Sequence, residues 1–235
     1  MSTDMPEPVT PEVCAMSEVY AARICWNSKG WVAPTGEAAQ LESGDTYAVR
    51  MGFGHEEWLF NRDWVVEGWK YGFLQPVSPS RTRLEGKTID LRLYAIAPEH
   101  EWFYVAEIAG CEVLSESLAD AARQQFDRRG WLDQMRAQVK QVNGNIAGLA
   151  QREATNLFNV RFRFENAAIH SLVPIKPTDA IRRLSRYRLA QLSGKLVRAK
   201  REWSARVKRV NVSSHRLTVG QVYTRKHLAH AFTTA

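Results

Sequence analysis

The chain has 235 residues, 45% of them hydrophobic and 24% charged, which is typical of a globular protein with one sizeable core. No apolar run approaches the roughly 20 residues of a membrane-spanning helix, and the acidic, proline-rich N-terminus has no features of a secretory signal. The net charge of +7 hides an asymmetry. Residues 1–175 hold 17 Lys and Arg against 23 Asp and Glu (net −6), whereas residues 176–235 hold 15 against 2 (net +13).

This charge asymmetry predicts a polyanionic partner for the basic part, with nucleic acid favoured over a solvated helical face or one that covers an acidic surface. The three cysteines, Cys14, Cys25 and Cys111, are odd in number and widely spaced. Their spacing argues against a zinc site or a disulfide framework and indicates reduced thiols. We therefore expect a cytoplasmic protein that has no membrane partner, metal or cofactor.

Residues 1–18 read as a disordered lead-in, and from about residue 19 short apolar runs alternate with turn signals. This pattern predicts strands at Val19–Trp26, Thr46–Phe53, Trp64–Pro76, Thr88–Ile96, Trp102–Ile108 and Leu157–Phe164. Two helices interrupt them. The first is capped by Ser117 and ends at Gly130, and the second runs from Leu132 to about Gly144. With little βαβ alternation, the elements predict an α+β fold, a small mixed or closed barrel with inserted helices over residues 19–175.

Pro174 and Pro177 mark a boundary, after which Thr178 caps a long helical pattern that reaches Arg209. Its apolar stripe includes Leu189 and Leu192 and must pack on the barrel, on a second copy in a homodimer, or on another domain. Residues 176–215 are therefore predicted to form a basic helical linker region. Residues 216–235 resemble the start of a further module that is cut short.

Five tryptophans fall within 44 residues, among polar and glycine-rich neighbours: Trp26, Trp31, Trp58, Trp64 and Trp69. Several such rings can form a pocket for a flat or cationic ligand, whereas the alternative is a tryptophan-rich core. Two loops beside strands supply aromatic walls and polar edge groups: Trp26, Asn27, Ser28, Trp31, His55, Glu56, Glu57, Trp58, Asn61, Trp69 and Tyr71. For each residue, packing or loop bracing is the competing role.

Two stretches resemble known families. Val219-Gly-Gln-Val-Tyr-Thr-Arg-Lys-His-Leu228 is similar to the entry into C-terminal modules of bacterial restriction and defence nucleases, although His227 stands where an acidic residue is more usual. That resemblance implies the N-terminal part of a modification-dependent, type IV-like restriction protein with a downstream nuclease domain. Residues 20–175 look like a PUA-like barrel of the EVE, YTH and SRA type, through Gly86-Lys-x-Ile-x-Leu91, Tyr104-Val-Ala-Glu-Ile108 and Phe158-Asn-Val-Arg-Phe162. This second resemblance implies a reader of modified bases.

A base reader must extract one base from the stack, at a cost of a few kcal/mol, and aromatic stacking returns about 1–3 kcal/mol per base. The preferred walls are Trp26, Trp31 and Trp58, and the preferred edge readers are Glu57 and Asn61, with His55 third. Lysines and arginines that would contact the DNA backbone are Arg81, Arg83, Lys87, Arg161, Arg163, Lys200, Arg201, Lys208 and Arg209.

The sequence therefore predicts a DNA-binding recognition module that reads a modified, extruded base, with modified duplex DNA as its partner. An RNA-binding barrel of the same architecture is the first alternative, since aromatic pockets also hold unpaired RNA bases. A magnesium-dependent nuclease that uses Asp63, Glu85 and Lys87 is weaker, because Glu85-Gly-Lys87 reads as a turn. No catalytic motif of a hydrolase or nucleotide-binding enzyme occurs.

Overall fold

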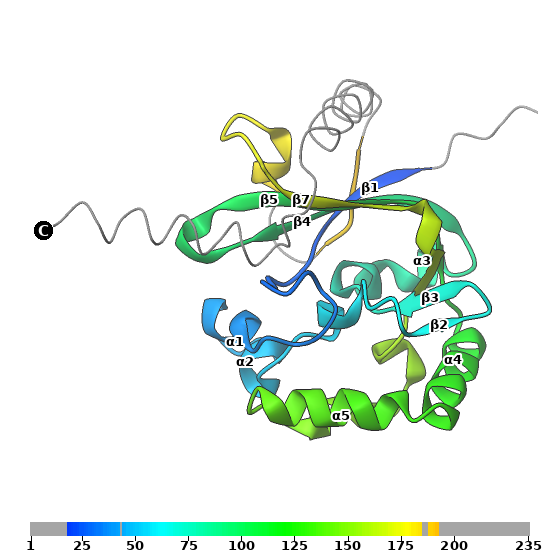
Figure 1. Cartoon of the computed structure of the whole chain (residues 1–235). Helices are drawn as coiled ribbons and strands as arrows, with labels where there is room; N and C mark the ends of the chain where they lie inside the picture. The colour runs from blue at the N-terminus through cyan, green and yellow to red at the C-terminus, as the bar shows by residue number, and fades with distance from the viewer. Residues whose placement is uncertain (1–17, 43, 185–187, 193–235) are drawn as a thin grey trace, which may run out of the picture.

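The computed structural model describes residues 18–42, 44–184 and 188–192 (Figure 1). In this part, eight strands form one sheet in the order β2-β3-β6-β5-β4-β1-β8, and β7 pairs with β5 beside that path. The strands are β1 (Val19–Arg23), β2 (Val65–Val66), β3 (Trp69–Gly72), β4 (Thr88–Ile96), β5 (Trp102–Val113), β6 (Val160–Arg163), β7 (Ala167–Pro174) and β8 (Ala190–Gln191). Strands β1 and β4 are parallel, and the other pairs are antiparallel.

The sheet is organised around the twelve-residue strand β5. One edge of β5 pairs with β4, and the other pairs first with β7, through residues 103–108, and then with β6, through Glu112 and Val113. Among the described strands no pairing joins β2 to β8, so the sheet is open. The prediction of a mixed α+β fold is thus confirmed at the level of an open, mostly antiparallel sheet with a few helices.

The helices are α1 (Glu37–Leu41), α2 (Tyr47–Met51), α3 (Arg81–Leu84), α4 (Glu116–Arg128) and α5 (Trp131–Gln141). Short 3₁₀ helices occur at η1 (His55–Trp58), η2 (Gln75–Ser80), η3 (Pro98–His100), η4 (Ile146–Leu149), η5 (Ala154–Asn156), η6 (Phe164–Asn166) and η7 (Ala180–Arg183). Figure 1 shows α1, α2, α4 and α5 together on one side of the long strands β4, β5 and β7. The two predicted helices are α4 and α5, but the side chain that caps α4 is Ser115, which accepts from the Leu118 amide, and not Ser117.

The predicted strand Thr46–Phe53 is wrong, because residues 47–51 form the helix α2. Thr46 caps this helix by accepting from the Val49 amide, and Gly52 ends it with a φ of 77°. The cap and the glycine therefore decide for a helix against the alternating apolar pattern, and Val49 of that pattern is exposed. The strand β7 was not predicted at all.

The predicted continuous helix from Thr178 is also wrong within residues 178–184 and 188–192, where the chain forms one 3₁₀ turn and the strand β8. Asp179, and not Thr178, caps that turn by accepting from the Ile181 amide. Leu192 is buried and Leu189 is partly buried, and both pack on this chain's own core. The rest of the predicted basic helix and the predicted module at 216–235 lie outside the described residues.

Three large apolar clusters and a small one of Cys25, Ala38 and Ala48 hold the described residues together. The first lies against the strands β1, β4, β5 and β6, and includes Trp26 and Trp31. The second joins α4 and α5 to the β2–β3 side of the sheet, and includes Trp58 and Trp64. The third contains Tyr94, Tyr104 and the segment around Ile181. The aromatic content of the loops is therefore divided between different parts of the core.

Candidate functional site

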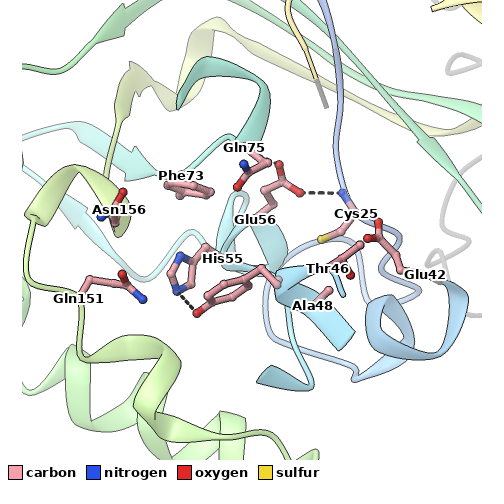
Figure 2. A pocket seen from close by; sticks show the side chains of 12 residues that line it. Cys25, Glu42, Thr46, Ala48, His55, Glu56, Phe73, Gln75, Gln151 and Asn156 are labelled. Atoms are coloured by element: carbon pink, nitrogen blue, oxygen red, sulfur yellow. Dashed lines mark hydrogen bonds between the residues drawn. The ribbon is translucent and has the colours of Figure 1, made fainter. Parts of the chain in front are cut away.

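A cavity of about 440 Å³ opens beside α2 and η1 (Figure 2). This volume lies within the roughly 300–1,000 Å³ that is common for small-ligand sites. Its lining comes from the ends of β1, α1 and β3, from α2 and η1, and from the chain between η4 and β6: Cys25, Glu42, Thr46, Tyr47, Ala48, Gly54, His55, Glu56, Phe73, Gln75, Gln151 and Asn156. Segments more than 100 residues apart in the sequence thus meet around one hollow.

Glu56 is the most constrained polar group of this lining. One carboxylate oxygen accepts from the Cys25 backbone amide at 2.7 Å, and the other accepts from the Gln75 backbone amide at 2.9 Å. Burial raises the pKa of Glu56 to about 7, and repulsion by Glu42 adds to the rise, whereas the two amides oppose it. The Cys25 thiol is a third hydrogen-bond partner of this carboxyl group, which leaves one of its four acceptor positions for a further donor.

Aromatic rings make up another wall. The hydroxyl of Tyr47 lies 2.8 Å from Nε2 of His55 and also donates to the Gly148 carbonyl at 2.8 Å. Burial lowers the pKa of His55 to about 4, so the imidazole is neutral at neutral pH. Phe73 meets this imidazole edge to face with 5.2 Å between ring centroids. The rings are tilted by 53° and 87° to the imidazole, so a flat ligand can stack on the face of one ring while another ring meets its edge.

Cys25 lines the cavity as a thiol and not as a thiolate. Burial raises its pKa well above the usual range, and the carboxylates of Glu56 and Glu57 raise it further. A protonated, buried thiol is a poor nucleophile. Gly54 packs so closely that a Cβ there would lie 2.8 Å from the Cys25 sulfur, so the wall depends on glycine at this position.

The lining has a definite charge character. It contains two carboxyl groups, three side-chain amides and two hydroxyls, and no Lys or Arg among the described residues that border it. No group of three or more His, Cys, Asp or Glu in the described ranges could hold a metal ion. The chemistry on offer is hydrogen bonding and ring stacking, which suits an uncharged or amine-bearing ring better than an anion.

Of the predicted base-binding residues, His55 and Glu56 line this cavity, whereas the two preferred edge readers brace loops. Glu57 accepts from the Gly54 and Thr35 amides at 3.0 and 2.9 Å, from the Thr35 hydroxyl, and from the Asn27 side chain. The oxygen of Asn27 accepts from the amides of Lys29 and Trp31. Asn61 bonds the Val32 carbonyl and the Asp63 amide. Bracing is therefore the role that these contacts support.

The prediction that Trp26, Trp31 and Trp58 converge on one slot is wrong. They are 3%, 2% and 4% exposed, and the first two lie in a different apolar cluster from the third. Trp26 borders a separate hollow of about 380 Å³ near Arg23 and His100, and the indole of Trp58 donates to Gln138 at 2.7 Å. The rings pack against the core because the loops that carry them fold back onto the sheet.

The remaining predicted base-binding residues also lie away from the cavity. The backbone amide of Ser28 donates to Glu37 at 3.0 Å. Trp69, on β3, lies under the guanidinium groups of Arg161 and Arg163, at 4.5 and 4.0 Å from the ring centroid. Tyr71 shares that face and accepts from Arg161 at 3.4 Å.

The residues predicted to contact the DNA backbone differ in how many contacts they make within the chain. Arg161 pairs with Glu112 at 2.8 Å, and Arg163 donates to the Glu67 carbonyl. Arg81 pairs with Glu85 at 3.2 Å, Arg83 is exposed and bonds the Tyr20 hydroxyl, and Lys87 is exposed. Asp63 and Glu85 are exposed as well, away from any described metal-binding group. Lys200, Arg201, Lys208 and Arg209 lie outside the described residues.

Sequence reasoning missed most of the cavity. Tyr47 was assigned to a strand, and Phe73 and Gln75 to the end of one. Gly54 was a local sequence signal for the cavity, because glycine permits the close approach to Cys25. Gln151 and Asn156 carry no such signal, because only the tertiary fold brings them near Cys25.

Comparison with models of known families, with characterised proteins and with solved structures finds no match for this chain. No described helix has the length and apolar character needed to cross a bilayer.

Proposed function

We propose that this chain is a recognition module that binds an unstacked nucleobase of modified duplex DNA in the cavity at Glu56. The observation that carries the proposal is the combination of aromatic walls, from Phe73, His55 and Tyr47, with hydrogen-bonding groups that face the same hollow. A base needs a π-face to replace its lost stacking and an edge partner for identification. The PUA-like resemblance of residues 20–175 points in the same direction.

The energetics are favourable for one base. Extrusion costs a few kcal/mol, and stacking on a ring returns about 1–3 kcal/mol. The edge contacts then supply the discrimination, since each hydrogen bond to a charged group contributes about 1.5–3 kcal/mol. Because the cavity has no basic lining, the phosphates stay outside it, where exposed residues such as Arg83 and Lys87 and the basic C-terminal part supply backbone affinity. A downstream nuclease domain would then be the effector.

The test is a titration of the protein with matched unmodified, methylated, hydroxymethylated and glucosylated duplexes at fixed salt. Phe73→Leu keeps an apolar side chain but removes the ring from the wall. We expect this variant to lose the preference for the modified duplex while it retains salt-sensitive background binding. Phe126→Leu is the matched control, because Phe126 lies in the second apolar cluster, away from the cavity.

Equal loss of preference in both variants, or no preference in the parent protein, would contradict the proposal. Single-stranded RNA is included as a competitor. Tighter binding of RNA than of any duplex would assign the cavity to an unpaired RNA base instead.

A further inference from the structure

Two carboxyl groups from different elements reach the same part of the cavity. Glu56 comes from η1, and Glu42 follows α1 with its side chain 10% exposed. Figure 2 shows both grouped around Cys25. They are near enough for Glu42 to raise the pKa of Glu56 by repulsion. Arg23 pairs with Glu42 at 3.9 Å and borders the neighbouring hollow, which Glu42 borders as well, but it does not line this cavity.

The hydrogen-bonding capacity of this corner is one-sided. Both Glu56 oxygens already accept one backbone amide each, and their remaining capacity is again for accepting. The other titratable groups here are Cys25, a protonated thiol, Tyr47, His55, which is neutral, and Glu57, whose oxygens brace the loops. None of them supplies a positive charge, and the carboxylates of Glu56 and Glu42 only accept when they are ionised, so a group that binds between them must be a hydrogen-bond donor.

We propose that Glu56 and Glu42 together hold an exocyclic amine of the bound base through both of its N–H groups. The inference rests on the proposed function and narrows its substrate class. The cavity takes an amine-bearing base and rejects a base with a carbonyl at that position, because a carbonyl oxygen would face two carboxyl groups. The modification that is read therefore lies on a ring carbon and not on the amine, since an N-methyl group removes one of the two donors.

The pH dependence follows from the same geometry. Below neutral pH the buried Glu56 carboxyl keeps its proton and is a poorer acceptor, with a pKa of about 7 in the free cavity. An amine that donates to Glu56 favours the ionised form, so binding releases a proton. Affinity for the amine-bearing base is expected to rise between pH 6 and pH 8 and then to level off.

The experiment compares oligonucleotides that differ at one unpaired position. Each amine-bearing base is matched with its counterpart that lacks the amine: cytosine with uracil, adenine with hypoxanthine and guanine with hypoxanthine. N4-methylcytosine and 5-methylcytosine form the second comparison. We expect at least one amine-bearing base to bind about tenfold more tightly than its counterpart, and N4-methylation, but not C5-methylation, to remove the advantage.

Glu42→Gln is the main variant, because the one ion pair of Glu42 is the long contact to Arg23 at 3.9 Å, and glutamine keeps the size of the side chain, so the fold should stay intact. Its amide can donate to a carbonyl, so the preference for cytosine over uracil should fall about tenfold or reverse, a shift that lost stability would not produce. Glu56→Gln should do the same and flatten the pH profile. Glu165→Gln, an exposed glutamate, is the control for charge alone.

The outcomes separate this inference from the proposed function. If duplex preference depends on Phe73 but cytosine and uracil bind equally, or if N4-methylcytosine binds as well as cytosine, the amine assignment is overturned and the base reader stands. If no oligonucleotide binds in a Phe73-dependent manner, both fail.

Discussion

Two neighbouring glutamates belong to regions with different roles, one that holds loops together and one that borders the cavity. Glu57 joins the tryptophan-bearing loops, where both of its oxygens are occupied by groups from Asn27, Thr35 and Gly54. Glu56, one residue earlier, borders a hollow, and its two backbone partners and the Cys25 thiol leave part of its hydrogen-bonding capacity unused. Both side chains are buried, at 0% and 3% exposed. The difference is one of hydrogen-bond saturation, and it indicates which polar groups are available to a ligand.

The largest expected effect is the loss of the Glu57 brace. Glu57→Ala leaves four donors without their acceptor in a buried site, which should lower the free energy of unfolding by about 4 kcal/mol. Urea denaturation measures this change in the free energy of unfolding. Glu57→Gln keeps one acceptor oxygen and should cost about half as much. A Glu57→Ala loss no larger than that of Glu56→Ala would contradict the contrast between the two regions.

The same contrast explains what the sequence could and could not predict. Strand β4 and helices α4 and α5 follow from local periodicity and capping and were predicted with small shifts of their ends, whereas β5 continues five residues past its predicted end at Ile108. The choice between Glu56 and Glu57 was not accessible, because it depends on whether Thr35 or Gln75 faces the carboxylate. The tryptophans are close together in the sequence but not in the structure, because the loops that carry them pack into different apolar clusters.

A third buried ionisable group, Lys70 on β3, sharpens the comparison because it neither braces a loop nor borders the cavity. It is 1% exposed, its ammonium lies 5.8 Å from the Trp64 ring centroid, and burial lowers its pKa from 10.5 to about 7. Between pH 7 and pH 10.5 the unfolded chain binds more protons at this site than the folded chain, so stability rises with pH there. Below pH 7 the penalty is fully present.

Lys70→Met should therefore stabilise the protein by an amount on the order of 3 kcal/mol at pH 7, and the gain should fade as pH approaches 10.5. Urea denaturation of both proteins at several pH values measures the difference. A gain that stays constant with pH would show that the lysine is charged in the folded state or that its side chain reaches water.

The smallest expected effects compare an engaged arginine with an exposed lysine on the outer surface. Arg163 lies 4.0 Å from the Trp69 ring centroid and donates to the Glu67 carbonyl at 2.8 Å, whereas Lys87 is exposed. A side chain that is already bound contributes less to phosphate neutralisation, because it must give up its partners first.

Lys87→Gln should lower the slope of log affinity against log salt by about one unit and leave stability unchanged. Arg163→Gln should cost about 1 kcal/mol of stability and leave the slope unchanged. If the slope instead falls with Arg163→Gln, the strand face that carries Trp69 contacts the nucleic acid, and the surface next to β6 must be included in the binding site.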